Sequence, residues 1–251
     1  MVSKRHALDL LSVDLSQKLE AVQSGEQILR SKNVCSGSGE EHALKRMFSG
    51  GMQNKLMHSL SGHFNLYNPR DEGERCILSE AVSYKNSYDI LDDSVRSKND
   101  IRLLRAFEVI GSEVMGREAR IREVPIYTKP DRYGNSIEYP DPDALKDNFL
   151  LLANYIFDSP RPSFARGVVA STAFLNLHPF HDGNGRLGRF LLNYMWGRLP
   201  SKYIPFSVIH GLSEGGYEIR LRLAQIFNEW DELIDYYFFI LKQLSGFRAE
   251  M

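Results

Sequence analysis

The chain has 251 residues, of which 43% are hydrophobic and 25% are charged, and its formal net charge is -1 at pH 7. This length suffices for a large hydrophobic core, and the composition is that of a globular protein, not of a disordered one. The near balance of charges argues against a general affinity for nucleic acid.

The amino-terminal part of the chain carries few strong signals. Residues 1–18 interrupt their apolar side chains with charges every few positions, unlike a signal peptide, and no later run reaches transmembrane length. Cys35 and Cys76 are far apart and match no CxxC pattern, which favours thiols in a reducing compartment. We therefore expect a cytoplasmic protein without a membrane partner. The polar, glycine-rich residues 31–41 predict a linker or mobile loop.

A change of pattern separates a helix from a predicted β-hairpin. Residues 101–118 place apolar side chains at helical spacing. Residues 122–143 then form short β-prone pieces around prolines and a Tyr-Gly-Asn turn at 133–135. This segment predicts a β-hairpin within an otherwise helical half of the chain.

Strongly apolar helices are predicted after the hairpin. The first spans 143–158 with Asp143 as its N-cap, and the second spans 163–178 with Ser163 in the same role. Their broad apolar faces favour buried positions. Further helical segments follow at 188–199, 214–227 and 231–244. The fold class predicted from these segments is all-α with one hairpin.

Residues 178–189 read HPFHDGNGRLGR and contain the chemistry of the chain. Gly183, Asn184 and Gly185 form a turn directly before a helix. Unpaired backbone N–H groups and the positive end of the helix dipole favour an anion there. This turn predicts a phosphate site.

Charged and titratable side chains flank the turn. Arg186 and Arg189 are three residues apart on one helix face, and their guanidinium groups suit further phosphate oxygens. Asp182 supplies a hard oxygen ligand for Mg²⁺. His178 ends the preceding apolar helix and can accept a proton from an attacking hydroxyl. Phe180 is expected to anchor the loop in the core.

This segment resembles the signature of the Fic family, HxFx(D/E)GNGRxxR, and every specified position is matched in order. The resemblance extends from about Ile101 to Leu244. It implies an all-α fold in which about six to eight helices carry a β-hairpin flap over the active site. We expect a catalytic domain at 99–246 and an amino-terminal helical extension at 1–98, with a regulatory or target-docking role.

The resemblance also implies an activity, that of a protein adenylyltransferase, or AMPylator, which is a nucleotidyltransferase. His178 would activate a Ser, Thr or Tyr hydroxyl of a target protein, which attacks the α-phosphate of ATP and releases pyrophosphate. Asp182 would hold Mg²⁺, and the Gly-Asn-Gly turn would stabilise charge at the α-phosphate. The two arginines would hold the β- and γ-phosphates.

Several residues bear on what is transferred, and to which target. The Doc branch of the family has a lysine where this chain has Gly185 and transfers the γ-phosphate, so the glycine favours AMP transfer. Branches that use UTP, GTP or CDP-choline are not excluded by the signature. Tyr217 lies where many relatives place an aromatic residue against adenine. Ile126 and Tyr127, in the flap, are predicted to clamp an extended target segment by strand addition.

The inhibitory motif of many relatives, (S/T)xxxE(G/N), has no clean copy in this chain. Glu72 is preceded by Asn68 instead of Ser or Thr, Glu214 is preceded by His210, and residues 83–87 lack the glutamate. Three explanations stay open: a toxin restrained by a separate antitoxin protein, a degenerate motif, or another mode of regulation.

Two rival readings explain fewer residues. A hydrolytic metal site made of His178, His181 and Asp182 would leave Arg186 and Arg189 without a role, and its ligands crowd into five positions. A catalytically silent scaffold would not need His178. His181 fills a variable position of the signature and is expected at the surface.

Overall fold

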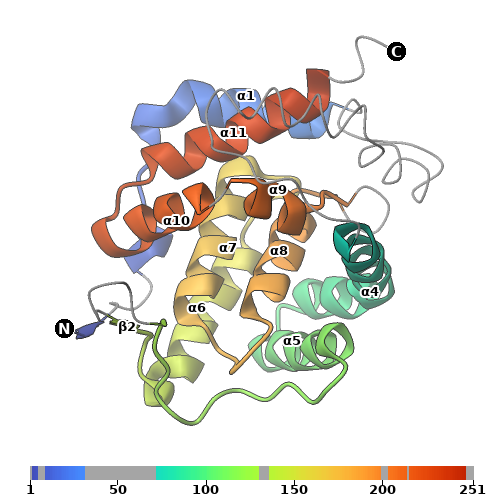
Figure 1. The fold of residues 1–251 in the computed structure, drawn as a ribbon, viewed down its shortest axis with the longest axis vertical. Helices are drawn as coiled ribbons and strands as arrows, with labels where there is room; N and C mark the ends of the chain where they lie inside the picture. The colour runs from blue at the N-terminus through green and yellow to red at the C-terminus, as the bar shows by residue number, and fades with distance from the viewer. Residues whose placement is uncertain are drawn as a thin grey trace.

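The computed structural model describes residues 2–4, 9–31, 72–129, 136–198, 203–213 and 215–246, and these are predominantly α-helical (Figure 1). The elements in chain order are β1 (Val2–Lys4), η1 (Asp9–Ser12), η2 (Ser16–Lys18), α1 (Leu19–Arg30), α4 (Glu72–Arg96), α5 (Asp100–Met115), β2 (Ser136–Glu138), η3 (Pro142–Ala144), α6 (Leu145–Phe157), α7 (Phe164–Leu177), α8 (Asn184–Met195), α9 (Phe206–Leu212), α10 (Gly216–Phe227) and α11 (Asp231–Gly246). The predicted all-α fold class is confirmed.

Some features predicted from the sequence lie outside the described residues. These are most of the linker at 31–41, Cys35, the Tyr-Gly-Asn turn at 133–135 and Glu214. Across the described ranges, no helix combines the length and the apolar character that crossing a bilayer requires.

Helix α7 is the centre of the fold. It contacts α1, α6, α8, α10 and α11, and in Figure 1 it runs through the middle of the molecule while α1 and α11 cross one end. Its sequence is mostly apolar, and most of its residues, such as Val168 and Phe174, are buried. Because neighbouring helices cover most of α7, the position of its carboxyl end, where the signature begins, is fixed by the core.

The helix N-termini differ in detail from the sequence predictions. Asp143 is not the N-cap of α6, because a 3₁₀ turn precedes this helix and the Asp141 carboxylate accepts the Asp143 N–H at 3.0 Å. Ser163 occupies the N-cap position of α7, but its side chain makes no capping hydrogen bond. Instead, Glu26 of α1 accepts from both the Ser163 hydroxyl and the Phe164 N–H, each at 2.8 Å. A distant carboxylate thus caps the central helix.

The amino-terminal segments contact the predicted catalytic domain directly. Asn99, at the predicted boundary, caps α5 by accepting the Arg102 N–H at 2.9 Å. On the amino-terminal side of this boundary, α4 packs along α5. Its fully buried Tyr84 donates to the Arg186 carbonyl oxygen at 2.5 Å. The division into an extension and a catalytic domain stays a prediction, and these contacts join the two parts.

The two arms of the hairpin predicted at 122–143 pair in the antiparallel sense. The Thr128 N–H donates to the Ile137 carbonyl at 2.9 Å, and the Tyr139 N–H donates to the Ile126 carbonyl at 3.1 Å. Strand β1 pairs in parallel with the outer edge of β2. Because bonding alternates along a strand, the N–H and C=O of Tyr127 point to the opposite edge of the hairpin.

We expect Glu26→Ala to lower the free energy of unfolding by about 1–2 kcal/mol, because it removes the acceptor at the amino terminus of α7. Urea denaturation followed by circular dichroism measures this change. The matched control is Glu20→Ala, at an exposed position of the same helix, with an expected change below about 0.5 kcal/mol. An unchanged midpoint for Glu26→Ala would contradict a stabilising role for this cap.

Candidate active site

The signature loop leaves α7 through a strained residue. His178 is the C-cap of α7 and adopts a left-handed conformation with φ of 49°, which is uncommon for a residue other than glycine. Its ring Nδ1 lies 3.3 Å from the Leu175 carbonyl oxygen. Since a carbonyl oxygen only accepts, Nδ1 carries the hydrogen in this contact, and in the neutral ring Nε2 then carries the lone pair. This orientation is the one in which a neutral imidazole would accept a proton at Nε2.

A side-chain amide shapes the rest of the loop. The Asn184 amide oxygen accepts the Phe180 N–H at 3.0 Å, and its amide nitrogen donates to the Phe180 carbonyl at 2.6 Å. Both residues are buried, and the Phe180 ring enters the core as the sequence predicts. The Asn184 side chain is thus committed to the loop, and what this residue can offer an anion is its backbone N–H.

Gly183 starts α8 in a conformation that requires glycine. Its φ is 82°, and a Cβ atom here would lie 2.5 Å from the Met115 sulfur. The N–H groups of the following first turn have no acceptor within the helix, and they share the positive end of the helix dipole. The start of α8 therefore has the backbone geometry of an anion site.

The two signature arginines extend this site along α8. The Arg186 guanidinium donates to the Val114 carbonyl at 3.0 Å and lies 3.9 Å from the Asp182 carboxylate. Arg189 is partly exposed one turn further along the helix. Both cations therefore lie beside the positive end of α8, which suits a ligand with several negative charges.

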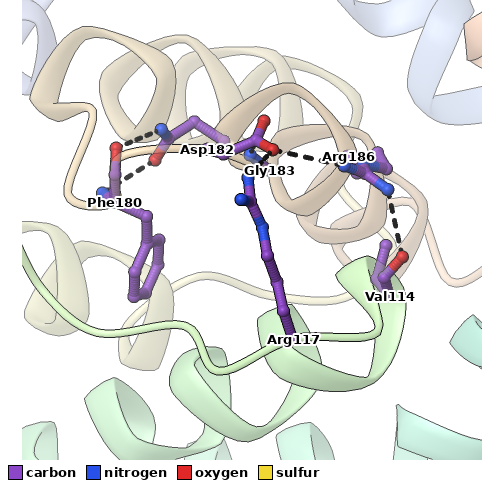
Figure 2. A network of polar contacts seen from close by, with 7 residues as sticks. Val114, Arg117, Phe180, Asp182, Gly183 and Arg186 are labelled. Atoms are coloured by element: carbon purple, nitrogen blue, oxygen red, sulfur yellow. Dashed lines mark hydrogen bonds and ion pairs between the residues drawn. The ribbon is translucent and has the colours of Figure 1, made fainter.

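Asp182 lies between two cations at the edge of the loop. Figure 2 shows Arg117, just after α5, reaching its carboxylate, and the two are 2.5 Å apart. The Gly183 N–H, at 2.7 Å, and the Arg117 guanidinium hold the pKa of the Asp182 carboxyl below its usual value. Because its pKa is lowered, the carboxylate is charged at neutral pH. Its side chain is 52% exposed and therefore accessible.

The chemistry around Asp182 fits a magnesium ion that is shared with a nucleotide. No cluster of three or more acidic, His or Cys ligands occurs in the described part of the chain. Mg²⁺ commonly takes one or two carboxylates and fills its remaining positions with water and phosphate. A hollow of about 230 Å³ beside Asp182 and Arg117 has room for such waters. A cation, the Arg117 guanidinium, already contacts this carboxylate.

Tyr217 lies at the start of α10, on the Arg189 side of the site. Its ring stacks on His210 with centroids 3.5 Å apart and is 8% exposed, so one face is already covered. Burial raises the pKa of Tyr217 to about 12, and the charge of Arg189 acts on it in the opposite direction. The predicted contact with adenine stays a prediction, and it is limited to the remaining face and edge.

The predicted target clamp lies in the first arm of the hairpin. Ile126 is partly buried and Tyr127 is 52% exposed, with its hydroxyl 3.4 Å from the Glu138 carboxylate. His181 is exposed, as its variable position in the signature predicts. Clamping of a target segment by these two residues stays a prediction.

Several residues that shape the site could not be found from the sequence. Arg117 contacts Asp182, the Val114 carbonyl holds Arg186, and Tyr84 contacts the first turn of α8. Arg122 and Tyr139 contact the His178 loop from the hairpin side. None of them belongs to a motif, and only packing brings their segments to the loop.

The fold and the signature loop have counterparts among known proteins. The structure is similar to that of a Fic family protein from Desulfovibrio desulfuricans G20, with a TM-score of 0.54 and 16% sequence identity, over 96% of this chain and 71% of the other. At this level of identity the similarity concerns the fold alone, and it shows that the helices are arranged as in that protein.

Sequence comparison identifies the family. The model of the Fic/DOC family matches residues 98–196. A Fido domain-containing protein from Dictyostelium discoideum is 32% identical over 108 residues, which are 41% of this chain and 73% of the relative. The chain belongs to the Fic/DOC family. It is also 28% identical over 83 residues to a uridine 5'-monophosphate transferase from Xanthomonas campestris, which is 30% of this chain but only 16% of the relative.

We expect Asn184→Ala to lower the free energy of unfolding by about 2 kcal/mol, because both backbone groups of buried Phe180 lose their partner. The control is Asn154→Ala on the exposed face of α6, which should change stability by less than about 0.5 kcal/mol. Chemical denaturation of the three proteins compares them. Equal midpoints for Asn184→Ala and the wild type would mean that the loop keeps its shape without this amide.

Proposed function

We propose that the protein transfers AMP from Mg-ATP to a Ser, Thr or Tyr hydroxyl of a target protein. The observation that carries this proposal is the orientation of His178, whose Nδ1 contacts the Leu175 carbonyl so that Nε2 is the basic nitrogen. The same loop ends in the positive end of α8, which suits the phosphates. A base and an anion site on one short loop are what nucleotidyl transfer to a hydroxyl requires.

Each residue then has a defined part in the reaction. The target hydroxyl oxygen forms a bond to the α-phosphorus while its proton moves to His178 Nε2, and the bond to the β-phosphate oxygen breaks to release pyrophosphate. Backbone N–H groups at the start of α8 stabilise charge on the α-phosphate. Arg186 and Arg189 hold the leaving phosphates. Asp182 would hold Mg²⁺, which neutralises charge on the phosphates when bound.

Gly185 supports transfer at the α-phosphate. It is helical and exposed, and a Cβ atom added to it would meet only Arg189 Nη1, at an ordinary contact distance of 3.5 Å. The fold therefore does not require glycine at this position. A phosphate that packs closely against the helix start does, because a side chain would occupy its place.

UMP transfer is the second candidate, and a relative supports it. One similar protein is named a uridine 5'-monophosphate transferase, although this chain spans only 16% of its length. The same loop residues would serve UTP, because they contact phosphates and not the base. The base would be selected near Tyr217 at the start of α10.

The partners and the setting follow from the same proposal. The target would present a hydroxyl on an extended segment that pairs with the open edge at Tyr127. A separate antitoxin protein is one of three proposed sources of restraint, beside a degenerate motif and another mode of regulation. Ser87 belongs to the segment 83–87, which lacks the glutamate of the inhibitory motif. Its hydroxyl donates to Glu113 at 2.7 Å and so links α4 to α5. A cytoplasmic setting, where Mg-ATP is abundant, suits this activity.

We expect His178→Ala to abolish transfer and to leave Mg-ATP binding within about twofold of the wild type, since the imidazole acts on the hydroxyl and not on the nucleotide. The purified protein and a cell lysate are incubated with Mg²⁺ and either α-labelled ATP, γ-labelled ATP or α-labelled UTP. Protein label from α-labelled ATP alone, lost in the variant, supports AMP transfer. Label from α-labelled UTP alone would favour UMP, and label from γ-labelled ATP alone would contradict nucleotidyl transfer.

Arg189→Ala is expected to weaken the binding of ATP at least tenfold and that of AMP less than about threefold, because its charge-assisted contact is made to the terminal phosphates. Isothermal titration calorimetry with each nucleotide gives the two affinities. Equal losses for ATP and AMP would contradict the assignment of Arg189 to the terminal phosphates.

A further inference from the structure

A buried cation lies between the hairpin and the catalytic loop. The Arg122 side chain is among the largest fully buried ones, with 1% of the residue exposed. It lies between α5 and the paired arms of the hairpin, at 126–128 and 137–139. The segment between α5 and these arms follows the lower edge of the molecule in Figure 1. No part of the reaction proposed above uses this residue.

The guanidinium of Arg122 bonds to both neighbouring segments at once. On the catalytic side it donates to the His178 carbonyl at 2.9 Å and to the Leu177 carbonyl at 3.4 Å. On the hairpin side it donates to the carbonyls of Val124, at 3.2 Å, and Pro140. One rigid planar group therefore fixes the end of α7 relative to both arms of the hairpin.

These acceptors are neutral, which makes the burial of the charge costly. No hydrogen bond of its guanidinium among the described residues goes to a carboxylate, and the charge of Asp141 acts on it from a distance. Burial lowers the pKa of the Arg122 guanidinium, but arginine keeps its charge in proteins. An apolar side chain could fill the same volume without this cost, so the bonds to these carbonyls are the reason for a cation here.

The residue that Arg122 contacts is the strained one. His178 has a left-handed backbone, and such a conformation persists only where its surroundings impose it. The backbone of Arg122 adds a second constraint, because its N–H donates to the Pro179 carbonyl at 2.9 Å. Ile121 forms an antiparallel bridge with Phe180 next to it. The backbone of the loop is thus paired with the segment that precedes the hairpin.

The hairpin also contacts the imidazole itself. Tyr139 stacks on the His178 ring with centroids 4.0 Å apart and an interplanar angle of 29°. It directly precedes Pro140, the Arg122 acceptor, and its N–H ties the second arm to Ile126 in the first. The imidazole is consequently held on one face by the ring, at Nδ1 by Leu175 and at its backbone by Arg122.

We infer that Arg122 and Tyr139 are positioning residues that couple the hairpin to the catalytic base, so that the arrangement of the flap and the orientation of His178 form one mechanical unit. The inference rests on the proposed role of His178 as the base. Its consequence is that loss of the Tyr139 ring releases the imidazole without touching the nucleotide phosphates, which bind on the α8 side of the loop.

The kinetic test compares Tyr139→Leu with Tyr139→Phe. The leucine variant loses the stacked ring, and kcat for protein labelling is expected to fall roughly tenfold to a hundredfold, while KM for Mg-ATP changes less than about twofold. The phenylalanine variant retains the ring and restores kcat to within about threefold of the wild type. A fall in kcat of the same size in both variants would overturn the role of the stacked ring.

A second readout does not depend on activity. Nitrogen-15 spectra of histidine-labelled protein distinguish the two imidazole tautomers, and His178→Ala identifies the signals of residue 178. We expect hydrogen on Nδ1 in the wild type and in Tyr139→Phe, and a mixture of tautomers in Tyr139→Leu and Arg122→Met. An unchanged His178 pattern in both Tyr139→Leu and Arg122→Met would overturn the inference.

The two readouts separate the possible failures. If the wild type labels no protein while the tautomer pattern changes as expected, the proposed function fails and the positioning of His178 stands. Arg122→Met removes a buried group, so its fold is checked first by circular dichroism. If this variant does not fold, the Tyr139 pair decides, since Tyr139 is only partly buried.

Discussion

The helix dipole of α7 is matched at both ends by a charge from another part of the chain. At the amino terminus the Glu26 carboxylate accepts from the Phe164 N–H, and at the carboxyl terminus the Arg122 guanidinium donates to the Leu177 and His178 carbonyls. A negative charge at the start and a positive charge at the end stabilise a helix in its observed direction. Since α7 is largely buried and carries His178 at its end, the position of the proposed base depends on this pair of charges.

The loop after α7 is held in one shape by its own residues. The two bonds between the Asn184 amide and the backbone of Phe180 close the loop within a few residues, and Gly183 allows α8 to begin in a left-handed turn. The imidazole and the positive end of α8 therefore share one short segment. Binding of the proposed polyphosphate would therefore need little reorganisation, which is the condition under which such electrostatic stabilisation is effective.

The charges around the loop favour a polyanion over a protein carboxylate. Arg117 and Arg186 both lie near the Asp182 carboxylate, and the ion pair between Asp182 and Arg117 is half exposed. Exposed pairs of this kind contribute only about 0–1 kcal/mol. Breaking this pair would therefore cost little free energy. Arg117 could exchange the carboxylate for a phosphate oxygen, and Asp182 could exchange the guanidinium for a metal ion.

Segments outside the signature supply much of this arrangement. Tyr84 and Glu26 come from helices that precede the residues matched by the Fic/DOC family model, and they contact α8 and α7 directly. The amino-terminal helices therefore support the site in addition to any regulatory role. Their removal would expose the buried Tyr84 contact and uncap the central helix.

The sequence by itself determined the helical class, the hairpin and the signature loop, because helical periodicity and a contiguous motif are local properties of the chain. It also indicated that Phe180 is buried and that His181 is exposed. Only the tertiary structure decided which residues surround the loop. Arg117, Arg122 and Tyr139 come from segments that reach it through packing, and no pattern in the chain marks them. The cap predicted at Ser163 illustrates the same limit. Ser163 occupies the N-cap position of α7, but its side chain does not accept from the helix. The fold brings the Glu26 carboxylate of α1 within 2.8 Å of the Phe164 N–H, and this carboxylate is the acceptor instead.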